Sequence, residues 1–206
     1  NIVFSDADEK AVGRGVRQCF LNSGQSCNAP TRMIIEQQIY ESAIEQAKIM
    51  AAKIEVGPSE IEGRHIGPVA SKAQFDKIQS LIELGITEGA RLICGGRGQP
   101  EGMKGGYFVK PTIFADVTPD MTIFKKEIFG PVLCMSSFLE EQEAISKAND
   151  TTYGLTNFIQ TSDMKKANRV ASQLKSGMVE VNGRLLSPAS PFSGHRQSGN
   201  GTEGGI

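Results

Sequence analysis

The chain has 206 residues, of which 22 are basic and 23 are acidic. Its length suits one domain, or a domain with an appendage, and is sufficient for a substantial buried core. The balanced charge disfavours nucleic acid binding, no apolar run approaches the roughly 18 residues of a membrane span, and the start does not resemble a signal peptide.

Apolar periodicity predicts alternating strands and helices. In chain order we predict a strand at 1–4, a helix at 5–23, a strand at 31–38, helices at 39–54 and 71–90, strands at 91–96, 107–110, 112–117 and 131–138, a helix at 139–150, a strand at 155–160, a helix at 162–177 and a strand at 178–182. Segments 56–69, 118–130 and 183–206 are predicted to be turns and loops.

Helices of ten or more residues between strands indicate β-α-β crossovers. The expected fold is therefore α/β, with a mostly parallel sheet and helices on both faces. The predicted helix caps are Ser5 or Asp6, Ser71 and Ser162. Functional loops of such sheets gather at the carboxyl ends of the strands, and we expect the site there.

Four cysteines are spread along the chain without a C-x-x-C pair, and neither His65 nor His195 is near them in sequence. A metal site is therefore not expected. Cys19, Cys94 and Cys134 lie in apolar patterns and are predicted to be buried small hydrophobes. This cysteine usage favours a reduced protein of the cytoplasm.

Cys27 has a different setting, because the loop around it, LNSGQSCNAP, is polar. Ser26 and Asn28 flank the thiol and are candidates to orient a substrate carbonyl or hold an oxyanion. A cysteine is a good nucleophile once its thiolate fraction rises. A structural thiol remains the alternative, and a Cys-His hydrolase would need a histidine brought close by folding.

Two further segments have both a functional and a structural interpretation. In KKEIFGPV, Glu127 is either a surface partner of a neighbouring lysine or a carboxylate that accepts bonds from a ribose diol, and Phe129 could pack on a flat ring. The glycine-rich tail is not expected to hold phosphate, because no helix follows it. Phe192 in this tail is either a pocket wall or part of the core.

Taken in order, several segments resemble the aldehyde dehydrogenase superfamily over essentially the whole chain. They are NIVFSDAD, NSGQSCNAPTR, GPVAS followed by QF, EIFGPVL, NDTTYGLT, SGMVEVN and PFSGHRQSGNGTEGG. Each motif is short, but their order makes a chance match very improbable. Two departures, Pro30 in the cysteine loop and Ser193 in the tail, are expected to tune loop shape only.

The resemblance implies roles for individual residues. Cys27 matches the catalytic nucleophile, and Asn22 matches an asparagine that shapes its loop. Glu127 matches the glutamate that binds the nicotinamide ribose, Phe129 the aromatic residue beside the nicotinamide, and Gln74 falls near a position that touches the ribose. Phe192 matches an aromatic residue of the substrate tunnel.

The resemblance also implies that some parts of the catalytic machinery lie outside this chain. Residues 1–206 are expected to be a catalytic thiol domain truncated at both ends, with the dinucleotide-binding domain absent. The general-base glutamate and one oxyanion-hole amide are expected in a segment before Asn1, and a segment that supports oligomerisation after Ile206. The isolated chain is therefore expected to be nearly inactive.

The implied activity is the NAD(P)-dependent oxidation of an aldehyde to a carboxylate, through a thiohemiacetal and a thioester on the cysteine. The implied cofactor is NAD or NADP. The implied partners are a small aldehyde, the dinucleotide-binding domain of the same protein and further copies in a homodimer or homotetramer. The alternatives are an acylating relative that passes the acyl group to coenzyme A or phosphate, and a non-catalytic interaction domain with an exposed thiol.

Overall fold

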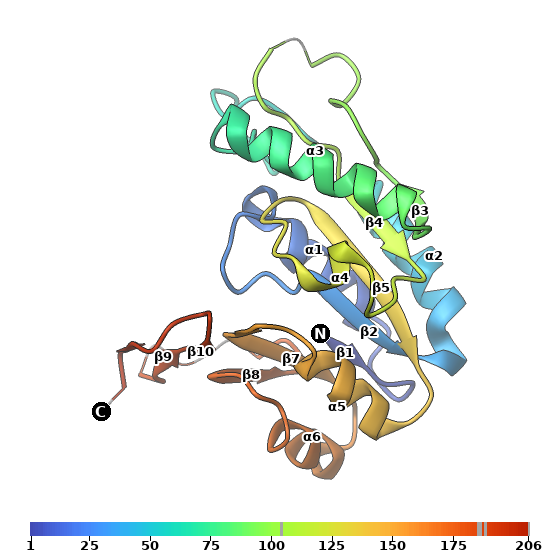
Figure 1. Cartoon of the computed structure of the whole chain (residues 1–206), viewed down its shortest axis with the longest axis vertical. Coiled ribbons are helices and arrows are strands. Elements are labelled where there is room, and N and C mark those ends of the chain that lie inside the picture. The colour runs from blue at the N-terminus through green and yellow to red at the C-terminus, as the bar shows by residue number, and fades with distance from the viewer. Residues whose placement is uncertain (104, 185–186, 188, 206) are drawn as a thin grey trace.

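The computed structural model describes residues 1–103, 105–184, 187 and 189–205, and its centre is a seven-stranded sheet (Figure 1). The strands are β1 (Ile2–Val3), β2 (Arg32–Glu36), β3 (Arg91–Cys94), β4 (Thr112–Ala115), β5 (Val132–Phe138), β7 (Thr156–Gln160) and β8 (Met178–Val181). Their order is β3-β4-β5-β2-β1-β7-β8, and the pairs are parallel except β3 with β4. The predicted mostly parallel sheet is confirmed.

Helices cover both faces of this sheet, as predicted. They are α1 (Ala11–Phe20), α2 (Tyr40–Ala51), α3 (Lys72–Thr87), α4 (Thr122–Lys125), α5 (Glu141–Asn149) and α6 (Met164–Ala171), with the short 3-10 turns η1 (Leu21–Gly24) and η2 (Gln37–Ile39). Because side chains alternate along a strand, Val3 packs into the layer of α1 and α2, whereas Ile2 packs against α5 and α6. Helices α3 and α4 cover the end of that second face near β4 and β5.

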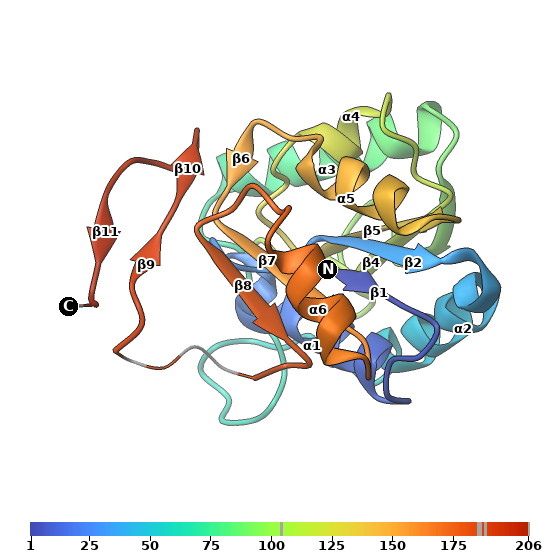
Figure 2. The same cartoon turned by 90° about the horizontal axis from the view of Figure 1, so that it is seen from below.

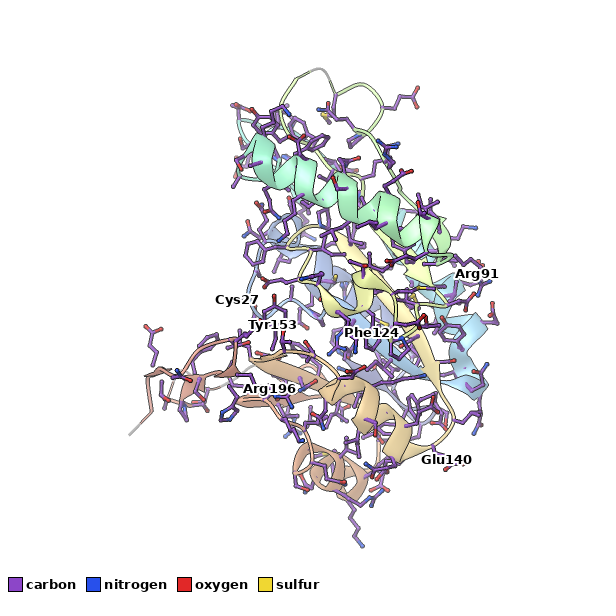
Figure 3. The ribbon with its side chains drawn as sticks, in the orientation of Figure 1. Cys27, Arg91, Phe124, Glu140, Tyr153 and Arg196 are labelled. Carbon is purple, nitrogen blue, oxygen red and sulfur yellow. The ribbon has the colours of Figure 1, made fainter. Side chains whose placement is uncertain are left out.

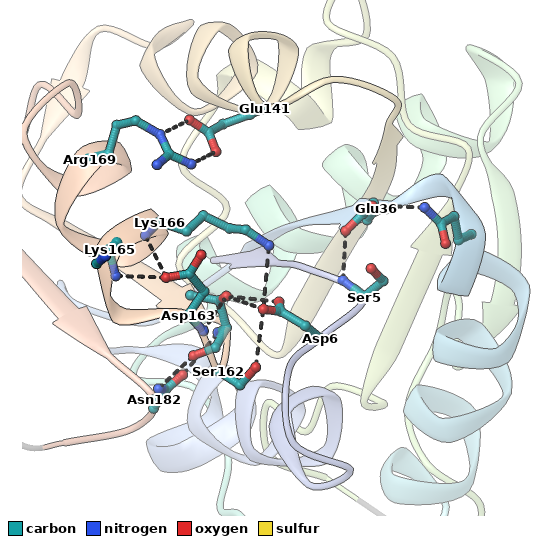
Figure 4. A network of polar contacts seen from close by, with 12 residues as sticks. Ser5, Asp6, Glu36, Glu141, Ser162, Asp163, Lys165, Lys166, Arg169 and Asn182 are labelled. Atoms are coloured by element: carbon teal, nitrogen blue, oxygen red, sulfur yellow. Dashed lines mark hydrogen bonds and ion pairs between the residues drawn. The ribbon is translucent and has the colours of Figure 1, made fainter.

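The first helix begins later than predicted. It starts at Ala11, and its N-cap, Lys10, makes no side-chain cap bond. The predicted caps are used elsewhere: the Ser5 N–H donates to Glu36 at 2.7 Å, and Asp6 accepts from the Thr161 hydroxyl at 2.8 Å (Figure 4). These contacts tie together the carboxyl ends of β1, β2 and β7, so tertiary bonds replace the predicted capping.

The other helix caps agree in part with the prediction. The Ser71 hydroxyl accepts from the Gln74 N–H and caps α3, which ends two residues before Gly89. For α6, the cap is Asp163 instead of Ser162, because its carboxylate accepts from two successive N–H groups of the first turn. Helix α6 ends at Ala171, several residues short of the predicted glycine stop.

In two segments the observed secondary structure is of a different type from the predicted one. Residues 107–110 form no strand of the sheet, because the Tyr107 carbonyl accepts from Val69 N–H at 2.9 Å in a neighbouring loop. The segment 118–130, predicted to be irregular, contains the short helix α4. Its Ile123 and Phe124 are each 2% exposed, and burial of these side chains stabilises the turn.

The predicted C-terminal loop contains short strands. They are β9 (Phe192–Ser193), β10 (His195–Arg196) and β11 (Thr202–Glu203); β11 pairs with β9, and β10 pairs with β6 (Tyr153–Gly154). Figure 2 shows this segment at one side of the sheet, beyond β6. The part of the predicted loop at Leu185, Leu186, Pro188 and Ile206 lies outside the described residues.

None of the helices in the described ranges combines the length and the apolar character that crossing a membrane would require.

Candidate active site

A cavity of about 330 Å³ opens beside Cys27. Its lining comes mainly from four segments, within 24–32, 123–129, 151–157 and 197–198. Cys27, Ser26, Glu127 and Phe129, which were selected from the sequence, all line it. The volume lies at the lower end of the range typical of small-molecule sites.

The cavity lies at the amino ends of the parallel strands, so the predicted position at the carboxyl ends is wrong for it. Cys27 precedes β2, Glu127 and Phe129 precede β5, and Tyr153 precedes β7. Each of these loops leads from a helix into a strand, and in a parallel sheet such loops share the amino edge. The carboxyl edge instead holds the Asp6 contacts of Figure 4.

The cysteine loop has an unusual backbone. Three successive residues, Asn22, Ser23 and Gly24, have φ of 53°, 56° and 70°. Left-handed backbone costs a non-glycine residue about 1–2 kcal/mol, and asparagine tolerates it best. The Asn22 side-chain amide donates to the Gln25 carbonyl at 3.0 Å, which offsets part of this cost. That contact suits the loop-shaping role expected of Asn22, which stays a prediction.

Contacts with two other segments fix the loop. The Ser23 hydroxyl donates to Gly67 O at 2.7 Å, and the Gln25 side-chain carbonyl accepts from Ala70 N–H at 2.8 Å. Gly24 packs so closely on Gly130 that an added Cβ would lie 2.0 Å from the Gly130 oxygen. The motifs NSGQSC, GPVAS and EIFGPV, which are far apart in sequence, therefore touch one another.

The backbone of Phe129 is also left-handed, with φ of 57°, which is a genuine outlier for a bulky residue. The Gln74 side-chain amide donates to Phe129 O at 2.8 Å and to Ile128 O at 3.0 Å. Strain of this kind persists where the surroundings hold it, and it clusters at functional sites. Gln74 thus supports the segment that carries Phe129, and its predicted contact with a ribose remains a prediction.

Glu127 is exposed on this cavity wall. The alternative interpretation paired it with Lys125 or Lys126. Lys125 instead forms its ion pair with Asp150, and among the ion pairs of the described residues there is none between Glu127 and either lysine. The Lys125 ammonium also lies 5.7 Å from the ring centre of Phe124. Glu127 therefore presents a carboxylate to a cavity that also contains the Cys27 thiol.

Sequence reasoning missed a third wall of the cavity. Tyr153, Gly154, Gln197 and Ser198 line it, and Tyr153 lies close to Cys27 in Figure 3. The tail is held there by bonds from Gly154 N–H to the Ser198 hydroxyl at 3.0 Å and from Gln197 N–H to the Thr152 carbonyl at 3.1 Å. The motifs NDTTYGLT and GHRQSG were visible in the sequence, but nothing in either one indicated that they pair.

Other predicted site residues lie outside this lining. Phe192 pairs with Glu203 between β9 and β11, and neither it nor Asn28 or Asn22 is among the described residues that line the cavity. Their roles stay predictions. No histidine of the described residues lines the cavity either, and the His65 ring is bonded to the Pro58 carbonyl at 2.9 Å.

The four cysteines fall into two groups. Cys19 and Cys134 are buried at 0% and 3% exposure, and burial raises the pKa of both thiols, to about 12 for Cys134. Cys94 is half-buried, and its pKa is also raised by burial. Cys27 alone is exposed. Two of the three cysteines predicted as buried are thus fully buried, and Cys94 partly.

Iodoacetamide at pH 8 should therefore alkylate Cys27 of the native protein first. Cys19 and Cys134 should stay unmodified until the protein unfolds, because alkylation requires an accessible thiolate. Peptide mass mapping over a time course measures the four rates separately. Modification of Cys134 as fast as Cys27 would contradict this assignment of the exposed thiol.

The described residues contain no group of three or more histidine, cysteine, aspartate or glutamate side chains arranged to hold a metal ion. What the cavity offers is a thiol and a carboxylate on facing loops, at the amino edge of a parallel α/β sheet. This defines an α/β domain with an exposed cysteine thiol beside a cavity.

The comparisons with known proteins identify which α/β family this is. The sequence profile of the aldehyde dehydrogenase family matches residues 1–206, and the chain belongs to that family. A relative, 3-succinoylsemialdehyde-pyridine dehydrogenase of Pseudomonas sp., is 46% identical over 206 residues, which cover 100% of this chain and 43% of the relative.

Solved structures agree with the family assignment. An aldehyde dehydrogenase from Bartonella henselae matches with a TM-score of 0.99 and 59% identity, covering 100% of this chain and 43% of that one. A mutant of aldehyde dehydrogenase C from Pseudomonas syringae, in complex with NAD+ and octanal, matches with a TM-score of 0.97 and 42% identity, at the same coverage. The chain thus spans less than half the length of these relatives.

Proposed function

We propose that the protein containing this chain oxidises an aldehyde to a carboxylate with NAD or NADP, and that residues 1–206 supply its thiol-bearing catalytic domain. The observation that carries the proposal is that Cys27 and Glu127, 100 positions apart, line one cavity. Family membership supports it, as does the relative that binds NAD+ and octanal. The substrate class is an aldehyde, without further detail.

The Cys27 thiolate would attack the aldehyde carbon, forming a C–S bond while the carbonyl electron pair moves to oxygen. In this proposal the Cys27 backbone N–H donates a hydrogen bond to the oxyanion. Loss of hydride from the same carbon leaves a thioester on Cys27, and water then releases the carboxylate and the thiol. Cysteine suits both stages, because it attacks well and its thioester is readily hydrolysed.

The residues present fit a nicotinamide cofactor. The exposed Glu127 carboxylate can accept hydrogen bonds from both hydroxyls of a ribose, and the half-buried Phe129 ring can pack beside a flat ring. Gln74 fixes the backbone between them. When bound, the cofactor supplies the hydride acceptor for the reaction.

We propose that the remaining functions come from outside these 206 residues. Among the described residues, Glu127 is the single carboxylate that lines the cavity, and it is assigned to the cofactor. A water-activating base and most cofactor contacts would then belong to a dinucleotide-binding domain of the same protein, which would assemble as a homodimer or homotetramer. The four free cysteines suit a reducing compartment such as the cytoplasm.

The test is an assay of the intact protein with an aldehyde such as octanal and NAD+ or NADP+, followed by NAD(P)H absorbance and product analysis. Carboxylate formation without coenzyme A supports the proposal. Acyl-CoA formation that depends on added coenzyme A would favour the acylating relative. If no aldehyde of a panel gives reduced cofactor, the result would favour an interaction domain. Robust activity of the 206-residue chain alone would contradict the proposal that the base and most cofactor contacts lie outside it.

The Glu127 assignment predicts a change in cofactor binding. E127Q should raise the KM for NAD+ by about tenfold or more, because a charged acceptor contributes about 1.5–3 kcal/mol to a hydrogen bond. The rate of Cys27 alkylation should not change. E140Q is the matched control, since Glu140 is exposed beyond β5, away from Cys27 (Figure 3). Equal KM values in both variants would refute the ribose contact.

A further inference from the structure

Arg32 links three walls of the cavity. It is the first residue of β2, five positions after Cys27, and it lines the cavity together with Phe124 and Ala148. Neither the sequence motifs nor the proposed chemistry assigned it a role. Its partners decide what it does, because each belongs to a segment that forms the site.

One set of partners is the carboxyl end of α5. The Arg32 guanidinium donates to the Ala148 carbonyl at 2.9 Å and to the Lys147 carbonyl at 3.1 Å, with a longer contact of 3.5 Å to Asp150 O. The last carbonyls of a helix lack partners within the helix and carry partial negative charge. A cation held there satisfies them and fixes the turn that leads to Tyr153.

The other partner is Phe124 in α4. The Arg32 guanidinium carbon lies 4.8 Å from the centre of this ring, which is 2% exposed. A cation–π contact of this kind contributes about 0.5–2 kcal/mol, more when water is excluded. Phe124 stands three residues before Glu127, and the Lys125–Asp150 ion pair ties α4 to the same turn after α5.

We propose that Arg32 is a positioning residue that holds α4, and through it Glu127, in place relative to Cys27. This inference rests on the proposed function, because its readout is cofactor binding by Glu127. The Arg32 guanidinium is engaged with the carbonyls at the end of α5 and with the Phe124 ring, so its proposed role acts through these segments. Its loss frees the segment before Glu127 while leaving the Cys27 loop held by its own contacts at Gly67, Ala70 and Gly130.

The experiment uses the intact protein with R32M, R32K and the control R91M. Arg91 is likewise the first residue of a strand and is held by Glu41 at 2.9 Å and Asp116 at 2.7 Å, but it lies far from Cys27 (Figure 3). R32M should raise the KM for NAD+ about tenfold, with kcat changed less than threefold and Cys27 alkylation less than twofold. R32K keeps the positive charge, and its KM for NAD+ should lie between the values of R32M and wild type. R91M should match wild type.

A fourth variant, F124L, keeps the proposal testable if R32M does not fold. F124L should raise the KM for NAD+ in the same direction, and combining it with R32K should give less than the product of the two effects, because both act through one contact. An unchanged KM in R32K and F124L, or equal losses of kcat and alkylation rate, would overturn the positioning role. Absence of NADH formation by wild type would instead overturn the proposed function, and this inference with it.

Discussion

Replacement of Cys27 by alanine should abolish aldehyde oxidation by the intact protein, lowering kcat by at least about 10⁴-fold. Without the Cys27 thiol the covalent intermediate does not form, because the other cysteine that lines the cavity, Cys134, is 3% exposed and burial raises the pKa of its thiol to about 12. Cys27 is exposed and makes no contribution to the buried core, so stability should change little. The Kd for NAD+, measured by direct binding to the inactive variant, should also be near the wild-type value.

C94A is the matched control for this substitution. Cys94 is half-buried in β3, which forms the opposite edge of the sheet from β7 and β8. It is not among the described residues that line the cavity. C94A should retain activity within about twofold. Residual activity of C27A above about a tenth of wild type would remove Cys27 from the mechanism.

Substitution of Gly24 by alanine should damage both activity and stability. The added Cβ would lie 2.0 Å from Gly130 O and 2.7 Å from Pro131 N, and backbone atoms cannot move aside as a flexible side chain can. Alanine at φ of 70° also adds about 1 kcal/mol of strain. We expect a loss of at least about 3 kcal/mol in the free energy of unfolding, and a Cys27 displaced from Glu127.

G102A is a control that has the backbone strain of alanine at a positive φ without the steric clash expected for G24A. Gly102 has φ of 80°, but a Cβ there would meet no atom within 4 Å. It should therefore lose about 1 kcal/mol and keep full activity. Urea unfolding of both variants measures the difference. If G24A and G102A lose equal stability, the close approach of the two loops does not hold the site together.

The fold could largely be predicted from the sequence, because it depends on local periodicity. Short apolar runs placed most of the strands, and the stripe from Val12 to Phe20 placed the buried face of α1. Helix boundaries were predicted less accurately where a predicted capping residue bonds to a distant residue instead. Asp6, for example, accepts a hydrogen bond from Thr161 and does not cap α1. Such partners are far apart in the chain, and no local pattern reports them.

The site was predictable only in part. The polar loop identified Cys27, and the family resemblance pointed to Glu127, but the edge of the sheet was predicted wrongly by applying the rule for strand-to-helix loops. The cysteine loop runs from helix to strand, so its order in the chain already indicated the amino edge. The left-handed backbone of Phe129 and the pairing of β6 with β10 are tertiary features without a sequence signal.

Detection of the acyl group on Cys27 would test the proposed mechanism most directly. The intact protein is mixed with NAD+ and octanal, quenched in acid within the first turnover and mapped by peptide mass spectrometry. We expect an octanoyl thioester on Cys27 that forms only when NAD+ is present. NADH formation with no acyl group on Cys27, or with the acyl group on another residue, would contradict the proposed mechanism.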